Sequence, residues 1–180
     1  RIVRLYDALE KPDDSLKALE DLVQSYPQDV EHRRMLAGVY FQRSLKEIQS
    51  DQAELGLKHR TQDIENLEAA LQTGGGDMQD YLQICALMRF SKDTEKFSRF
   101  TQRAAQLFPQ EPRILFFDGV AQIYKKKYSD AAKLLDRAAK LAESSAPERL
   151  DHDFYFQQGI ALERSGGLEE AAKKFQKSIQ

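Results

Sequence analysis

The 180-residue sequence has one cysteine, no tryptophan and three histidines. A single cysteine, Cys85, excludes an internal disulfide framework and a zinc site built on cysteine. His32, His59 and His152 cannot form a metal motif, because none lies three to five residues from another. We therefore expect the histidines on polar helix faces, and the sequence predicts neither a metal site nor a cofactor site.

Long hydrophobic runs and an excess of charge are also missing. No apolar run approaches the ~18–20 residues that span a membrane, so direct membrane insertion is not expected. Lys and Arg number 27 against 29 Asp and Glu. A surface built to neutralise many phosphates carries a positive excess, so nucleic acid is not an expected partner.

The sequence starts without an initiator methionine and without a secretory leader. We therefore expect it to be a fragment of a longer chain. One cysteine is compatible with a reducing or an oxidising compartment. Between these the cytoplasm is favoured, and the periplasm remains an alternative.

Residues that favour β-strands are scarce. Val, Ile and Thr together number 17, whereas Leu and Ala number 40. Straight-chain helix formers therefore dominate, and the predicted class is all-α. Ten helices with short connectors are expected, the first at 1–11, and no long linker divides them into domains. The helix boundaries are marked by Tyr26-Pro27, Gly74-Gly75-Gly76, Pro109, Ser144-Ser145-Ala146-Pro147 and Gly166-Gly167.

Small residues recur in the middle of alternate helices. Cys85 and Gly119 lie 34 residues apart, Gly119 and Gly159 lie 40 apart, and Gly38 precedes Cys85 by 47. Small side chains, including Ala86 beside Cys85, allow two helices to approach closely. We therefore predict that each of these positions is the close point of one helix hairpin in a repeated array.

The spacing between Gly38 and Cys85 exceeds a 34-residue unit by thirteen residues. The surplus falls between Phe41 and Ile64, in an insertion at 42–63 whose two helices still have amphipathic patterns. The second hairpin is therefore predicted to be elongated, with its turn within 50–58. The insertion could make a lateral contact or be a tolerated elongation.

The array resembles the tetratricopeptide repeat family, whose pattern places an aromatic, Leu-Gly and Tyr in helix A, and Ala, Phe and Pro in helix B. The best match consists of Tyr155, Gly159, Leu162, Ala171 and Phe175. The resemblance implies a right-handed superhelical solenoid of about five antiparallel helix hairpins in a single domain, 1–180. Its units are placed at about 1–29, 30–76, 78–111, 112–151 and 152–180. Arg34 and Asp118 depart from the pattern, so other helix-hairpin repeats stay an alternative.

In proteins that this array resembles, the A helices line a concave groove that holds a peptide or helix of a partner. We predict that this groove is lined by Met35, Val39, Leu82, Ala86, Arg89, Arg113, Phe116, Val120, Phe156 and Ile160. Most of these side chains are apolar. The family's clamp for chaperone C-terminal carboxylates needs Lys and Asn here, so that class of ligand is not expected.

Neither a nucleophile–base pair nor a paired-acid motif occurs, so no catalytic residue is predicted. Cys85 lies on the packing face of its helix. Asp118 is expected to have a structural role, in which it reaches a basic residue or a helix end, or faces the seam between repeats. The predicted function is a non-enzymatic protein–protein interaction scaffold, which could also self-associate through its terminal repeats. The alternative is a substrate-recruiting or regulatory module of a larger multidomain enzyme or of a secretion or assembly protein.

Overall fold

The computed structural model describes residues 12–73, 76–90 and 93–179. Every regular element in these ranges is a helix, which confirms the all-α class. The predicted helix at 1–11 lies outside the described residues. Contacts divide the chain into two compact units, Arg1–Asp80 and Tyr81–Gln180, and each unit is described by itself. Within the described ranges, no helix is both long enough and apolar enough to cross a membrane.

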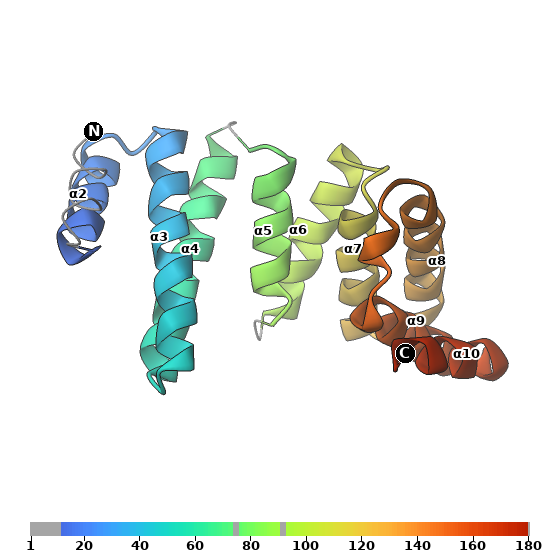
Figure 1. Cartoon of the computed structure of the whole chain (residues 1–180). Helices are drawn as coiled ribbons and strands as arrows, with labels where there is room; N and C mark the ends of the chain where they lie inside the picture. Colours follow the sequence, from blue (N-terminus) through green and yellow to red (C-terminus); the bar gives the residue numbers. More distant parts are fainter. Residues whose placement is uncertain (1–11, 74–75, 91–92, 180) are drawn as a thin grey trace. The chain divides into compact units, whose positions relative to one another are not determined.

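The first unit contains α2 (Pro12–Ser25), α3 (Val30–Gln49) and α4 (Ala53–Gln72) (Figure 1). Asp29 caps α3, because its carboxylate accepts a hydrogen bond from the backbone N–H of His32 at 3.0 Å. Leu19 of α2 packs with Leu36 and Tyr40 of α3 to form a small apolar core. The helices of this unit are therefore joined by the apolar stripes that their sequences predict.

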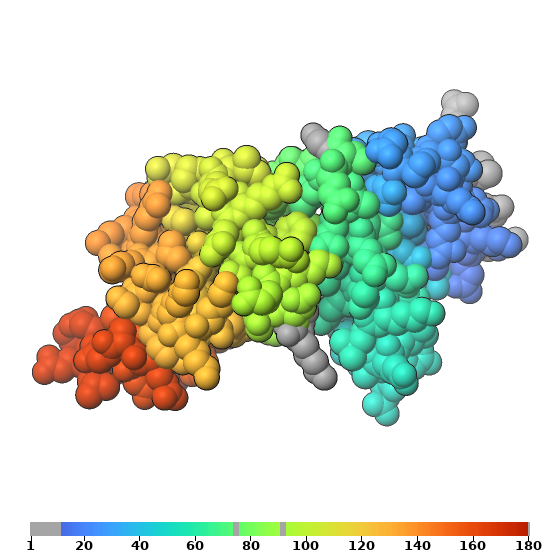
Figure 2. Space-filling model, turned by 180° about the vertical axis from the view of Figure 1, so that it is seen from behind, coloured from blue at the N-terminus to red at the C-terminus, as the bar shows by residue number. Residues whose placement is uncertain are grey.

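The elongated hairpin is formed by α3 and α4, which have 20 residues each and run side by side. Its turn lies at 50–52, within the predicted range, and contains Asp51 in a left-handed conformation with φ 64°. The hairpin extends past the end of α2 in Figure 1, and its turn forms the teal projection at the lower edge of the first unit in Figure 2.

The glycine that allows α3 and α4 to approach is Gly56. A Cβ atom at Gly56 would lie 2.9 Å from the carbonyl oxygen of Ser44 and 2.7 Å from Cγ1 of Ile48. The predicted close point, Gly38, is wrong, because no heavy atom of the described residues lies within 4 Å of a Cβ built there. The thirteen-residue elongation moves the contact toward the turn and leaves Gly38 facing open space.

Gly38→Ala is expected to raise the free energy of unfolding by up to about 1 kcal/mol, because alanine favours the helix over glycine and meets no neighbour. Urea unfolding followed by circular dichroism measures the change. A loss of stability would contradict the open surroundings of Gly38.

Arg34, which departs from the repeat pattern, is held by acidic residues at the start of α5 (Met78–Met88). Its Nη2 donates to Oδ2 of Asp80 at 2.6 Å, and its Nε donates to Oδ1 of Asp80 at 3.0 Å. Asp77 accepts a further hydrogen bond from Nη2 at 3.2 Å. A two-pronged ion pair therefore occupies the position where the family pattern has an aromatic ring.

The second unit holds the rest of α5, from Tyr81 onward, and five further α-helices with one short 3-10 helix. These elements are α6 (Thr94–Leu107), α7 (Pro112–Tyr124), α8 (Tyr128–Ser145), η1 (Pro147–Arg149), α9 (His152–Arg164) and α10 (Leu168–Ser178). Side chains of Asp93, Glu111 and Asp151 cap α6, α7 and α9. The helix boundaries therefore follow the punctuation of the sequence.

Gly119 and Gly159 have equivalent surroundings, as the spacing predicts. A Cβ at Gly119 of α7 would lie 2.7 Å from Cγ of Leu135 in α8. A Cβ at Gly159 of α9 would lie 2.5 Å from Cε1 of Phe175 in α10. Leu135 and Phe175 each follow their glycine by sixteen residues. The two hairpins are therefore repeats of one packing arrangement.

Candidate functional site

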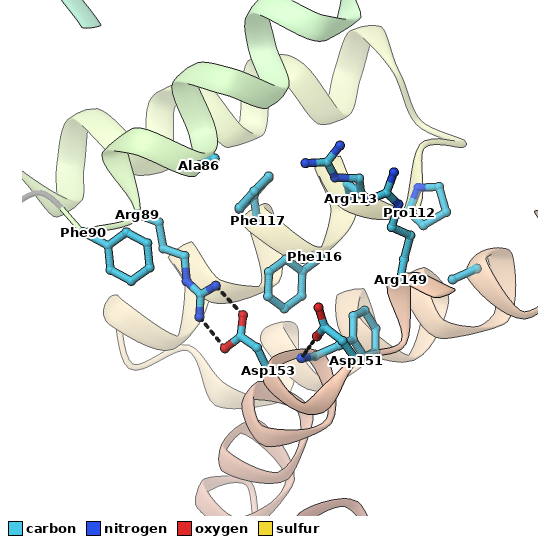
Figure 3. Close-up of a pocket in the computed structure, with 12 residues that line it drawn as sticks. Ala86, Arg89, Phe90, Pro112, Arg113, Phe116, Phe117, Arg149, Asp151 and Asp153 are labelled. Carbon is cyan, nitrogen blue, oxygen red and sulfur yellow. Dashed lines mark hydrogen bonds and ion pairs between the residues drawn. The ribbon is translucent and has the colours of Figure 1, made fainter. Parts of the chain in front are cut away.

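A cavity of about 230 Å³ opens in the second unit, where the end of α5 faces the first turns of α7 and α9 (Figure 3). We call it the α5–α7–α9 cavity. Its lining combines aromatic rings with charged side chains. The lining residues are Ala86, Arg89, Phe90, Pro112, Arg113, Phe116, Phe117, Ala142, Arg149, Asp151, Asp153 and Phe154.

Aromatic rings form the apolar part of the cavity. Phe116 of α7 is 9 % exposed, and its ring stacks on that of Phe154 of α9 with centroids 5.4 Å apart. Phe117 lies on the other side of Phe116, at 5.5 Å. Phe90, directly after α5, is 73 % exposed. The cavity therefore has a fixed aromatic wall and one aromatic side chain that is open to solvent.

One side of the cavity is closed by a two-pronged ion pair. The guanidinium of Arg89 donates from Nη1 and Nη2 to the two carboxylate oxygens of Asp153, the second at 2.7 Å. The same guanidinium lies 5.2 Å from the ring centroids of Phe90 and Phe116. Hydrogen bonding to Arg89 lowers the pKa of Asp153, so this pair is charged at neutral pH.

Arg113 and Arg149 lie on the other side of the cavity from Phe90 in the view of Figure 3. Arg113 is in the first turn of α7, where Pro112 fixes the backbone, and Arg149 is the last residue of η1. Asp151 faces its own helix, because its Oδ1 accepts a hydrogen bond from the backbone N–H of Phe154 at 2.9 Å. Two cationic side chains therefore border the aromatic wall.

Four of the predicted groove residues come together in this cavity. Ala86 belongs to α5 and Arg89 directly follows it, while Arg113 and Phe116 belong to α7. Leu82 and Val120, from the same helices, are instead buried in the core.

The other four predicted groove residues lie elsewhere. Met35 and Val39 line a separate cavity of about 360 Å³ in the first unit, beside α2 and α3. Phe156 of α9 is exposed, with its ring 5.9 Å from Phe175, and Ile160 is half-buried. These positions do not line the α5–α7–α9 cavity and stay predicted contacts.

The sequence analysis missed Phe90, Arg149 and Asp151 as cavity residues. Phe90 follows the last turn of its helix, so helical spacing assigns it to no face. Arg149 and Asp151 lie in and just after the connector that carries six residues more than a 34-residue unit. The six extra residues of this connector, directly before the predicted helix at about 152–165, were the sequence feature that could have indicated these two cavity residues.

The buried reactive groups of the second unit are engaged in packing. Asp118 of α7 accepts hydrogen bonds from Oγ1 of Thr101 in α6 at 3.2 Å and from Nε2 of Gln122 at 3.3 Å. It therefore lies at the predicted seam between repeats. Burial raises the pKa of Cys85 to about 12, and the nearby Asp118 adds to this effect. No metal-holding group of three or more His, Cys, Asp or Glu was found among the described residues.

A family model described as Tetratricopeptide repeat matches residues 1–47 and 118–180. No curated protein sequence matches the chain. Among solved structures, a crystal structure of MamA has a TM-score of 0.71 at 16 % identity, over 99 % of this chain and 93 % of that one. MamA from Desulfovibrio magneticus RS-1 has a TM-score of 0.69 at 12 % identity, over 99 % and 89 %. YrrB, described as a TPR protein with an unusual peptide-binding site, has a TM-score of 0.71 at 13 % identity, over 98 % and 81 %. At these identities the likeness concerns the fold.

Proposed function

Because the chain belongs to the tetratricopeptide repeat family, we propose that it is a protein–protein interaction module that binds a peptide or helix of a partner protein in the α5–α7–α9 cavity. The observation that carries the proposal is an exposed aromatic side chain, Phe90, at the edge of a cavity walled by Phe116 and Phe154. Aromatic side chains beside a pocket contribute much of the affinity in protein interfaces. An apolar side chain of the partner would pack against the wall of Phe116 and Phe154, with Phe90 at the edge of the cavity.

The architecture of related structures supports this proposal. YrrB has the same fold and a peptide-binding site. Repeat arrays offer extended surfaces on which short segments of other proteins can lie. The cavity volume of about 230 Å³ suits one large side chain, with the rest of the segment on the surface around it.

The proposed action is binding without catalysis. Cys85 is fully buried, and its raised pKa keeps it as a thiol at neutral pH. Asp118 is buried and accepts hydrogen bonds from Thr101 and Gln122. Neither group lines the α5–α7–α9 cavity.

Phe90→Glu is expected to weaken peptide binding about tenfold or more, because it removes an aromatic contact and places a carboxylate at the cavity edge. The probes are peptides selected by the wild-type chain from a phage-displayed random library, and fluorescence anisotropy measures their affinities. Phe90 is the residue of choice because it is exposed, so its replacement leaves the core intact. Replacing the buried Phe116 with a charged residue would test folding at the same time.

Leu107→Glu is the matched control for this experiment. Leu107 is an exposed apolar residue of the second unit that does not line the cavity, and the substitution changes the charge in the same way. Peptide affinity should stay within about twofold of the wild type. The proposal fails if the library yields no binding peptide, or if Phe90→Glu and Leu107→Glu bind the peptides equally well.

A further inference from the structure

The charges around the α5–α7–α9 cavity are unevenly compensated. Three arginines line it with two aspartates, Asp151 and Asp153. Asp153 is paired with Arg89 through two hydrogen bonds, and Asp151 accepts from the backbone at the start of α9. The acidic groups of the lining are therefore engaged with Arg89 and with a helix end.

Arg113 makes no ion pair with any residue in the part of the chain that the structure describes. The nearest acidic residue along the chain, Glu111, is turned to the backbone, where its Oε1 accepts from the N–H of Arg113 at 3.2 Å. Among the described residues, Arg149 forms an ion pair with its neighbour Glu148 alone, with 3.6 Å between Nε and Oε1 and both side chains exposed. An exposed pair of this kind contributes little binding energy, so the charge of Arg149 stays available.

The backbone holds both arginines in place. Arg113 follows Pro112 in the first turn of α7, and Arg149 ends a 3-10 helix that begins with Pro147. Arg113 lies in the first turn of α7, and Arg149 precedes α9. The N–H groups in the first turns of these two helices add positive partial charge. A ligand in the cavity therefore meets aromatic rings on one side and cationic groups on the other.

We propose that the α5–α7–α9 cavity selects partner segments in which an Asp or Glu side chain lies next to the apolar residue that enters it. The apolar residue packs against Phe116 and Phe154 at the edge that Phe90 forms. The carboxylate binds the guanidinium groups of Arg113 and Arg149. Arginine suits this role, because its planar group donates two parallel hydrogen bonds to a carboxylate. This inference rests on the proposed function and names the chemistry of its partner.

The same library tests the inference. Its peptides are fused to the coat protein through their C-terminus, so they have no free C-terminal carboxylate, and every carboxylate near the fusion-distant end of a peptide is an Asp or Glu side chain. Peptides that depend on Phe90 are expected to contain Asp or Glu beside an apolar residue. Arg113→Glu combined with Arg149→Glu is expected to weaken these peptides about tenfold or more and to remove the salt dependence of their binding. The double variant should itself select peptides with Lys or Arg at that position.

Arg99→Glu combined with Arg103→Glu is the matched control, because both residues are exposed on α6 and neither lines the cavity. It changes the net charge equally and should alter affinity by less than about twofold. Arg113→Gln with Arg149→Gln removes the charges without introducing acids, and circular dichroism checks the folding of each variant. Phe90-dependent peptides without an acidic preference overturn this inference and leave the proposed function standing. A selection without Phe90-dependent peptides overturns both.

Discussion

Gly119→Val is expected to lower the free energy of unfolding by about 2–3 kcal/mol, the usual cost of overpacking a filled core. The first atom of the new side chain would already lie 2.7 Å from Cγ and 2.9 Å from Cδ2 of Leu135. Leu135 is fully buried in α8, so it has no free space into which to turn. The two helices would have to separate, which exposes the apolar seam between α7 and α8.

Gly159→Val is the informative comparison, because its clash involves a side chain that can move. Its Cβ would lie 2.5 Å from Cε1 of Phe175, but Phe175 is only half-buried on α10. The ring can turn toward solvent, so the expected loss is about 1 kcal/mol or less. Urea unfolding followed by circular dichroism measures both variants. Equal losses of the free energy of unfolding in the two variants would show that the burial of Leu135 does not determine the cost of Gly119→Val.

The glycine series shows what the sequence can predict about this fold. The spacing of Gly119 and Gly159 predicts two equivalent close points, and the structure has them because Leu135 and Phe175 follow at the same interval. The same argument fails at Gly38. Spacing fixes the register only where two helices have the usual length, and here the contact between α3 and α4 has moved to Gly56.

The residues that line the cavity could also be predicted only in part from the sequence. A shift of 34 residues relates Leu82 to Phe116 and Ala86 to Val120, but Phe116 and Ala86 line the cavity whereas Leu82 and Val120 are buried in the core. The α7 segment is apolar on nearly all sides, so its sequence allowed both burial and groove lining for Val120. Helical spacing gives the direction of a side chain but not the depth at which a neighbouring helix covers it.

Helical spacing could not predict the cavity residues that lie outside the regular helices. Phe90 follows the end of α5, and Arg149 lies in η1 within a connector of irregular length. Their positions depend on how the chain turns between helices, which a helical period does not describe. The part of the cavity that gives it an open aromatic edge and a second cationic side chain on the side of Arg113 therefore emerged only from the structure.

Asp63 of α4 is expected to make the stability of the first unit depend on pH. The residue is fully buried, and burial raises its pKa from 3.8 to about 7, partly offset by the nearby charge of Arg60. Below about pH 4 the carboxyl is protonated in both the folded and the unfolded chain, so it carries no penalty. As the pH rises to about 7, the unfolded chain releases the proton while the folded chain keeps it, and the free energy of unfolding falls. Above that pH the loss is complete.

Asp63→Asn removes this titration and keeps the shape of the side chain. The variant should match the wild type near pH 4 and exceed its free energy of unfolding by a few kcal/mol at pH 8, since each pKa unit is worth about 1.4 kcal/mol. Urea unfolding across this pH range measures the difference between the two profiles. Ionisable groups other than Asp63 contribute to both profiles, so the difference between the profiles isolates Asp63. Parallel profiles would show that Asp63 is charged in the folded chain and is compensated there. Two profiles that coincide near pH 4 and separate as the pH rises would show that the burial of the Asp63 carboxyl lowers the free energy of unfolding at neutral pH.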